Sequence, residues 1–329
     1  MANILIYSVE EFSENHYKIF SGVYNDFRQK AFSEYKFELE PLEYEDFVKS
    51  VNDELIKCIV LMEDNIPTGF LAYTTVISEA LELNIIHCVG EENINHKRRL
   101  LIEKFLDLTK DLAKHKVITY PMLGAQADFV REITHYGFKL IGHCVTRFSL
   151  SNISSIKILK SLELPKLEEP YSITDWSSVY FDKAVEIIHS SFKDKTDALF
   201  DTRFKSLQGT ADIVEKITTG IYGEFLAAET KVLLYKDKPV GLCFANLTSP
   251  KIGNIPLVAV DKKHRAKGFS KLLLKNCVEN IVNTAINQGL PLLEVNASVD
   301  TDNYPAVKMY RTVGFKEDYN YPQAYKPVH

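Results

Sequence analysis

The sequence predicts a mixed α/β protein made of two tandem domains, each with a twisted mixed central sheet flanked by helices. The chain has 329 residues, more than one hydrophobic core usually serves, so two domains are expected. Two prolines and clustered charges interrupt the helix and strand patterns at residues 151–170. The same order of elements is read on both sides of this segment. We therefore expect one domain at residues 1–150, a linker at 151–170 and a second domain at 171–329.

The composition is that of a folded globular protein, with 46% hydrophobic and 25% charged residues. The formal net charge is -5, and lysine and arginine are dispersed along the chain. The chain therefore lacks the basic surface that nucleic-acid binding requires, and no nucleic-acid partner is expected. A mildly acidic surface suits a cationic substrate such as an amine, but it is also the common state of cytoplasmic proteins.

The five cysteines are odd in number, far apart and mostly within apolar runs, which predicts reduced core residues. They are Cys58, Cys88, Cys144, Cys243 and Cys277. No apolar run approaches the length of a membrane span, and the first residues lack a basic signal-peptide start. We expect a cytoplasmic protein without a membrane partner. The nine histidines are scattered and no metal-binding motif occurs, so no metal site is expected.

In the first half, the β-branched and apolar residues 57–61 predict a strand. Asp64 and Asn65 then form a turn, and residues 69–73 form the second strand of a hairpin. Near the end of this half, residues 129–136 predict a short helix that Gly137 terminates.

The second half repeats this order. Residues 232–235 and 240–245 predict a hairpin, residues 255–260 a buried strand, 268–288 a long helix and 292–299 another strand. A helix between two strands predicts a parallel crossover.

A second short helix, residues 306–313, is terminated by Gly314 and followed by Phe315. Aligning Gly137 with Gly314 places Val130 on Val307 and Lys139 on Lys316. We interpret the two halves as a tandem duplication whose copies have diverged.

The stretch from Val258 to Leu273 joins the predicted strand to the long helix through a tight basic turn. Small residues at Ala266, Gly268 and Ser270 let the chain approach a phosphate closely, and the exposed amides of a helix N-terminus favour an anion. Arg265 and Lys267 add positive charge there. A solvated loop that only caps the helix is the alternative interpretation.

The following motif begins at Asp302 and Asn303, either of which can cap a helix that tolerates Pro305 in its first turn. Spacings of three and four residues bring Asn303, Ala306 and Tyr310 near one face of that helix. This face carries an amide and a phenol.

Together the two motifs resemble those of the GNAT superfamily of N-acetyltransferases, over roughly residues 171–329. The acetyl-CoA loop of that superfamily, V-x-x-x-x-R-x-x-G-x-G/A, is matched by Val260, Arg265 and Gly268. Its next motif, N-x-x-A-x-x-x-Y-x-x-x-G-F, is matched by Asn303, Ala306, Tyr310, Gly314 and Phe315. The departures are Lys262 where proline is frequent, Ala266 where glycine is common and Ser270 where glycine or alanine is usual.

The resemblance implies that acetyl-CoA is the cosubstrate and that an amine attacks its thioester directly, with two central strands splayed apart to admit the pantetheine arm. The implied binding residues are Val258, Val260, Arg265, Ala266, Lys267, Gly268, Phe269, Ser270, Asn303, Ala306 and Tyr310. Tyr310 is the expected proton donor to the departing thiolate. An aromatic side chain packed between helix and sheet is the alternative for Tyr310.

The general base and the acceptor stay open. The strand at residues 255–260 carries no acidic residue, while Glu294, Asp300 and Asp302 are near in sequence and a water chain is equally compatible. His264 is interpreted as a solvated loop residue. The resemblance implies an amine of an unidentified small molecule or peptide as the acceptor. A non-catalytic acyl-CoA sensor or scaffold is the second functional hypothesis.

The first half lacks the corresponding chemistry. Its loop at residues 89–99 has no glycine at the matching place and carries Glu91 and Glu92, which oppose a phosphate. The position of Tyr310 corresponds to Ile133. We therefore expect a structural or substrate-shaping domain that does not bind acetyl-CoA.

Overall fold

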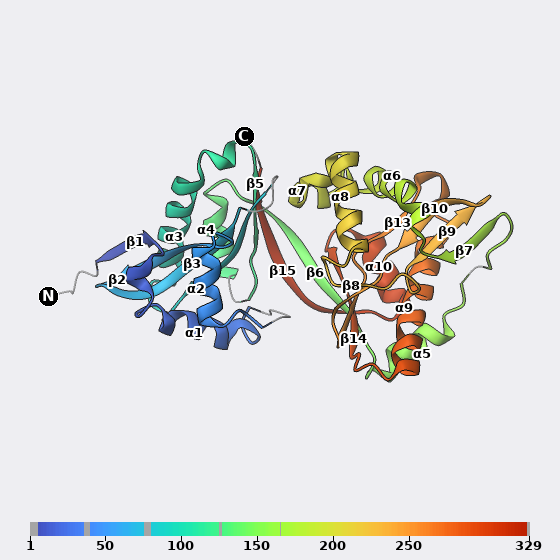
Figure 1. Cartoon of the computed structure of the whole chain (residues 1–329), viewed down its shortest axis with the longest axis horizontal. Helices are drawn as coiled ribbons and strands as arrows, with labels where there is room; N and C mark the ends of the chain where they lie inside the picture. Colours follow the sequence, from blue (N-terminus) through green and yellow to red (C-terminus); the bar gives the residue numbers. More distant parts are fainter. Residues whose placement is uncertain (1–5, 36–39, 76–79, 125–126, 165, 328–329) are drawn as a thin grey trace. The chain divides into compact units, whose positions relative to one another are not determined.

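The computed structural model describes residues 6–35, 40–75, 80–124, 127–164 and 166–327. The chain divides into two compact units (Figure 1). The first contains Met1–Ile141 and Tyr321–His329, and the second contains Gly142–Asn320. Both are mixed α/β structures, as the sequence predicts.

The first unit is built on a sheet with helices on both faces. Its strands, in spatial order, are β1 (Tyr7–Glu11), β2 (Lys57–Glu63), β3 (Ile66–Thr74), β4 (Ala80–Cys88), β5 (Val117–Pro121) and the end of β15 (Lys316–Lys326). Its helices are α1 (Ser21–Ala31), α2 (Tyr44–Asn52), α3 (Ile94–Thr109) and α4 (Ala127–Thr134), with 3-10 turns η1 (Glu14–His16) and η2 (Leu112–Lys114).

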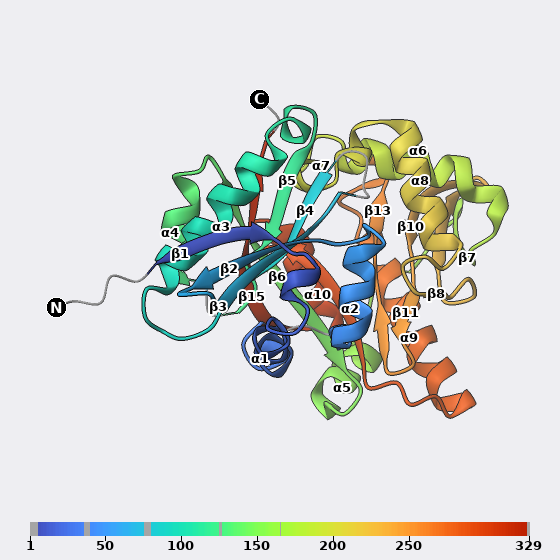
Figure 2. The same cartoon turned by 60° about the vertical axis from the view of Figure 1, so that its left-hand side comes forward.

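Alternation along the strands of this unit separates two hydrophobic cores. Val60 and Phe70 pack in the cluster that contains residues of α1 and α2. Their neighbours Ile59 and Leu71 pack in the cluster that contains residues of α3 and α4. Successive strand side chains point to opposite faces, so the sheet is covered on both sides (Figure 2).

The second unit contains two sheets. One has the order β13 (Val258–Val260), β10 (Lys238–Cys243), β9 (Lys231–Tyr235) and β7 (Tyr171–Asp175). The other runs through β6 (Lys139–Ser149), β14 (Glu294–Asp300), β12 (Ile252–Asn254), β11 (Asn246–Ser249) and β8 (Glu224–Phe225).

The helices of this unit are α5 (Ile153–Ser161), α6 (Phe181–Phe192), α7 (Asp197–Phe200), α8 (Leu207–Thr218), α9 (Phe269–Gln288) and α10 (Tyr304–Val313). Three 3-10 turns are η3 (Ser178–Tyr180), η4 (Thr202–Lys205) and η5 (Lys262–His264).

Several local predictions are confirmed. The hairpin of β2 and β3 turns at Asp64 and Asn65, which have φ angles of 49° and 67°. Helix α9 ends at Gly289 and α10 ends at Gly314, both in the left-handed conformation that glycine adopts easily. Pro305 lies in the first turn of α10.

Two strands belong to a different unit from the one that their position in the chain predicts. Seven residue pairs join β6 to β14, from His143 opposite Asp300 to Ser149 opposite Glu294. Residues 323–326 of β15 pair with β5. The division therefore differs from the expected bounds, because the end of the first half completes the second unit and the chain end returns to the first. The expected linker at 151–170 contains α5.

The prediction of one continuous strand at residues 255–260 is wrong, because the strand is interrupted. Strand β12 runs parallel to β14, and the amide of Ile255 still donates to the carbonyl of Asn296 at 2.9 Å. Pro256 follows and has no N–H to continue the ladder. Beyond it, β13 pairs with β10, whereas β14 pairs with β6. The two central strands are thus splayed apart after Ile255.

Candidate active site

The loop from β13 to α9 exposes a run of backbone amides. Asp261 begins it by accepting from the amide of Lys263 at 2.9 Å. Ala266 and Gly268 then adopt left-handed φ angles of 63° and 80°. No amide from residue 266 to residue 271 donates a hydrogen bond to another residue in the described ranges. Successive free amides at a helix N-terminus form an anion-binding concavity.

The two cations of this loop differ in their contacts. Arg265 donates from Nε to the carbonyl of Val260 at 2.7 Å and from Nη2 to Oγ of Ser191 at 2.8 Å. It therefore braces the loop against β13 and α6. Lys267 contacts the hydroxyl of Tyr171 at 3.0 Å and lies 5.3 Å from the centre of its ring. As an exposed ammonium, it can turn toward a bound phosphate.

Two aromatic contacts complete this end of the site. The hydroxyl of Tyr171 lies 2.9 Å from Nδ1 of His264, so that histidine contacts β7 rather than solvent alone. Phe269 packs on Tyr171, with ring centres 4.6 Å apart. Ser270 is partly exposed in the first turn of α9.

Helix α10 is positioned by Asn303, whose Oδ1 accepts from the amide of Ala306 at 3.4 Å. One helical turn further, Tyr310 is 6% exposed and its ring centre lies 5.3 Å from that of Phe315. In the part of the chain that the structure describes, the Tyr310 hydroxyl forms no hydrogen bond to another residue, and its oxygen is not fully buried.

Burial raises the pKa of Tyr310, and the negative charge of Asp197 acts in the same direction. The phenol therefore keeps its proton at neutral pH, as a proton donor requires. Tyr310 shares a hydrophobic cluster with Val260 and with the partly buried Val258, which face the same side of β13.

The other face of β14 is polar. Val295, Ala297 and Val299 belong to the core beneath α9 and α10, so the alternate residues point to the opposite face. They are Asn296, Ser298 and Asp300. Nδ1 of His143, on β6, lies 3.3 Å from Oδ1 of Asp300.

The charges of Asp300 and His143 also act on a further carboxylate, that of Asp197. Its neighbour Ala198 is 1% exposed and belongs to a buried cluster with Leu257 and Ala259. Burial raises the pKa of Asp197, and the charge of Asp300 raises it further; the backbone amide, His143 and Lys195 act in the opposite direction. The charge of Asp197 also acts on Tyr310.

The structure brings Asp300 to this site but not the other carboxylates suggested by sequence. Glu294 is ion-paired with Arg147, and Asp302 is exposed at the start of α10. Sequence reasoning missed Asp197 and His143. Asp197 stands in a mixed-charge segment that resembles an ordinary loop, and His143 lies in the other half of the chain, so neither carries a local signal.

The first unit has a different arrangement at its corresponding loop. Glu91 and Glu92 are exposed, and the ammonium of Lys97 lies 2.7 Å from Glu63. Ile133, the residue that aligns with Tyr310 when the two halves are superposed in sequence, is fully buried.

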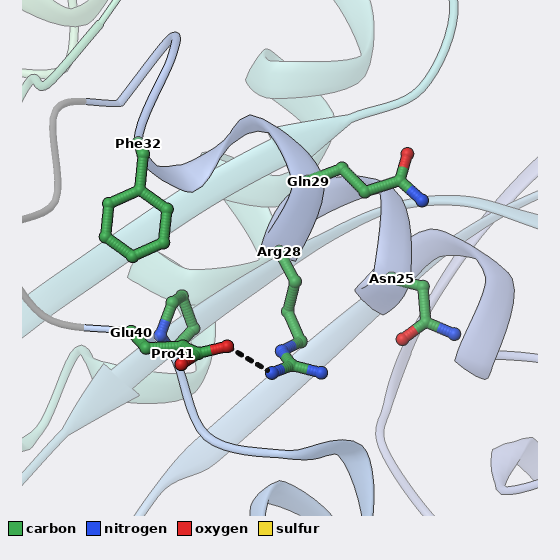
Figure 3. Close-up of a pocket in the computed structure, with 6 residues that line it drawn as sticks. All are labelled: Asn25, Arg28, Gln29, Phe32, Glu40 and Pro41. Carbon is green, nitrogen blue, oxygen red and sulfur yellow. Dashed lines mark hydrogen bonds and ion pairs between the residues drawn. The ribbon is translucent and has the colours of Figure 1, made fainter.

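A surface pocket of about 340 Å³ lies elsewhere on the first unit, at α1 (Figure 3). Within it, Arg28 contacts Glu40 at 3.1 Å, and it also contacts Glu43 at 2.6 Å. Its cation is therefore already compensated by two carboxylates. In the described ranges, no group of three potential metal ligands occurs, and no helix is long and apolar enough to cross a membrane.

Residues 198–315 match the model of the acetyltransferase (GNAT) family. This segment contains the amide-rich loop, the splayed strands and α10. This part of the chain is a GNAT-family acetyltransferase domain. No curated protein matches the sequence.

Solved structures show that the GNAT likeness extends to both units. A GCN5-related N-acetyltransferase from Sphaerobacter thermophilus is 12% identical, with 98% of this chain and 96% of that chain covered and a TM-score of 0.65. A tandem GNAT protein from the clavulanic acid biosynthesis pathway is 11% identical, with 98% and 99% covered and a TM-score of 0.59. The whole chain therefore has the fold of tandem GNAT proteins.

Proposed function

We propose that the protein transfers an acetyl group from acetyl-CoA to an amine of a small molecule or peptide, and that residues 171–329 carry the reaction. The observation that carries this proposal is the run of free amides at residues 266–271, which leads into the gap between β13 and β14. A pyrophosphate fits such a nest, and an extended pantetheine arm fits between splayed strands.

The residues assigned to acetyl-CoA divide by position. Ala266, Lys267, Gly268, Phe269 and Ser270 surround the pyrophosphate, while Arg265 holds the loop in shape. Val258 and Val260 flank the pantetheine arm, and Asn303, Ala306 and Tyr310 face it from α10. A strand amide in the gap stabilises the oxyanion that forms when the amine attacks the thioester.

Tyr310 then protonates the departing thiolate. Its buried phenol is protonated at neutral pH and has no competing hydrogen bond in the described part of the chain. These features favour catalysis over the alternative of a non-catalytic acyl-CoA sensor, because a sensor needs no proton donor at the sulfur.

Calorimetric titration with acetyl-CoA tests the cofactor site. We expect one site per chain, since Glu91 and Glu92 oppose a second one in the first unit. Gly268→Ala places a side chain at φ 80°, against the phosphate, and should weaken binding about tenfold or more. The matched control is Gly289→Ala, at the other end of α9, where φ is 64° and a Cβ meets nothing within 4 Å.

Equal affinity in the two variants would contradict the loop as the phosphate site. Two acetyl-CoA molecules per chain would contradict the structural or substrate-shaping role that we assign to the first unit. The five unpaired, buried cysteines support a cytoplasmic location for this function, since reducing compartments keep thiols free.

A further inference from the structure

We propose that Asp197 is the general base of this acetyltransferase and takes a proton from the ammonium group of a cationic amine acceptor. The inference rests on the proposed acetyl transfer and names the residue that prepares the acceptor for attack. It follows from the position of α7, from the lack of an ionic partner for Asp197 and from the buried phenol across the gap.

The packing of α7 fixes where Asp197 lies. The next residue, Ala198, is buried in one cluster with Leu257 and Ala259. These two residues point away from the face of β13 that carries Val258 and Val260. Asp197 therefore stands on the acceptor side of the splayed strands, opposite the helices that hold acetyl-CoA.

The carboxylate of Asp197 is available to a ligand. It is partly buried and forms no ion pair with any residue in the described ranges. The other acidic residue at this face, Asp300, already contacts His143. A desolvated carboxylate without a cation partner, set in an active site, is a typical general base.

Tyr310 lies close enough to Asp197 to feel its charge. Its side chain is 6% exposed, its oxygen is not fully buried, and its hydroxyl forms no hydrogen bond to another described residue. The hydroxyl is therefore open to a ligand. The proposed acid and the proposed base lie near enough to each other to serve one thioester and one amine.

The charges around Asp197 prepare it for proton transfer. Burial and the negative charge of Asp300 raise the pKa of Asp197 above its usual range, while its backbone amide, His143 and Lys195 lower it. The net effect is a raised pKa, which makes the carboxylate a better proton acceptor.

The proton balance is complete with these residues. Asp197 removes one proton from the ammonium, and the nitrogen lone pair then forms the new C–N bond with the thioester carbonyl carbon. The C–S bond breaks, and its electron pair takes a proton from Tyr310. The nitrogen loses its second proton through water, which restores Tyr310, and Asp197 returns its proton to solvent.

Acceptors that differ in their protonation state isolate this role. The probes are primary amines that are cationic at neutral pH, namely spermidine, glucosamine and a lysine-containing peptide, together with hydroxylamine, which is mostly uncharged there. Asp197→Asn should lower kcat/KM for the cationic probes by roughly 10²- to 10⁴-fold. Hydroxylamine turnover and acetyl-CoA affinity should be retained, because a neutral nucleophile does not need the base.

The matched control is Asp194→Asn, an exposed aspartate three positions earlier, which should behave as wild type. Unchanged turnover of cationic amines by Asp197→Asn would overturn the assignment. Equal losses with hydroxylamine and the cationic amines would also overturn it, since they indicate a structural role. A wild-type protein that acetylates none of the four probes contradicts the proposed function itself, an outcome distinct from either result.

The pH profile adds a readout that a structural role does not move. The base must be deprotonated, so kcat/KM falls on the acid side of its pKa. Asp300→Asn removes a charge that raises this pKa and should move the acid limb to lower pH. Lys195→Gln removes a charge that lowers it and should move the limb to higher pH. If the acid limb of the kcat/KM profile stayed at the same pH in both variants, the titrating group would not be Asp197.

Discussion

The amide of Ile255 donates to the carbonyl of Asn296 at 2.9 Å, which extends the parallel pairing of β12 with β14 by one residue. Pro256 ends the ladder; beyond it β13 pairs with β10, while β14 keeps the pairing with β6 that runs along its whole length. In a parallel sheet, the amides of one strand normally donate to the carbonyls of its neighbour along the whole length of the pair. Here the seam opens after Ile255, with the free amides of residues 266–271 following β13 and Tyr310 in the same hydrophobic cluster as Val260.

Replacement of Tyr310 by phenylalanine removes only the hydroxyl. We expect kcat to fall roughly 10²-fold or more, because the thiolate loses its proton donor, while acetyl-CoA affinity is preserved. Steady-state kinetics and calorimetry on the same preparation check this. Tyr304→Phe is the control on the same helix, since Tyr304 is 74% exposed. Full turnover by Tyr310→Phe would remove Tyr310 from the mechanism.

Replacement of Arg265 by methionine should weaken acetyl-CoA binding through the shape of the loop. The variant loses the bonds to Val260 and Ser191 while it keeps most of the side-chain length. Ser191→Ala removes one of these bonds and should show a smaller loss, of about 1 kcal/mol in binding free energy. Isothermal calorimetry measures both. An Arg265→Met protein with wild-type affinity would show that the loop holds its conformation without this brace.

The returning end of the chain should stabilise the first unit. Ala324 on β15 is fully buried in the cluster with Leu81, Ile118 and Phe129. Ala324→Asp places a charge there without a partner and should cost at least about 3 kcal/mol of unfolding free energy. Urea denaturation followed by circular dichroism measures the loss.

Asn320→Asp is the matched control on the same strand, because its side chain is exposed, and it should stay within about 0.5 kcal/mol of wild type. If Ala324→Asp proved as stable as this control, the closing strand would not be part of the cooperative core.

Local motifs were predictable because their structure depends on neighbouring residues. Gly268, Gly289 and Gly314 mark left-handed positions that other residues avoid, and Asn303 caps the helix that carries Tyr310. The GNAT fold of the second unit, its loop and α10 could therefore be inferred from the sequence. The interruption at Pro256 was missed because the apolar run around it continues without a change of pattern.

The sequence by itself determined the turn with Gly268 before α9, the helix that carries Tyr310 and the two-domain order, since short-range spacing and backbone preference specify them. Only the tertiary structure decided which strands complete each unit and which charges meet at the polar face of β14. His143 and Asp300 are 157 positions apart, and the charges of both act on the pKa of Asp197, which lies on a four-residue helix. Such contacts are set by strand pairing and by burial of Ala198, and no periodicity along the chain records them.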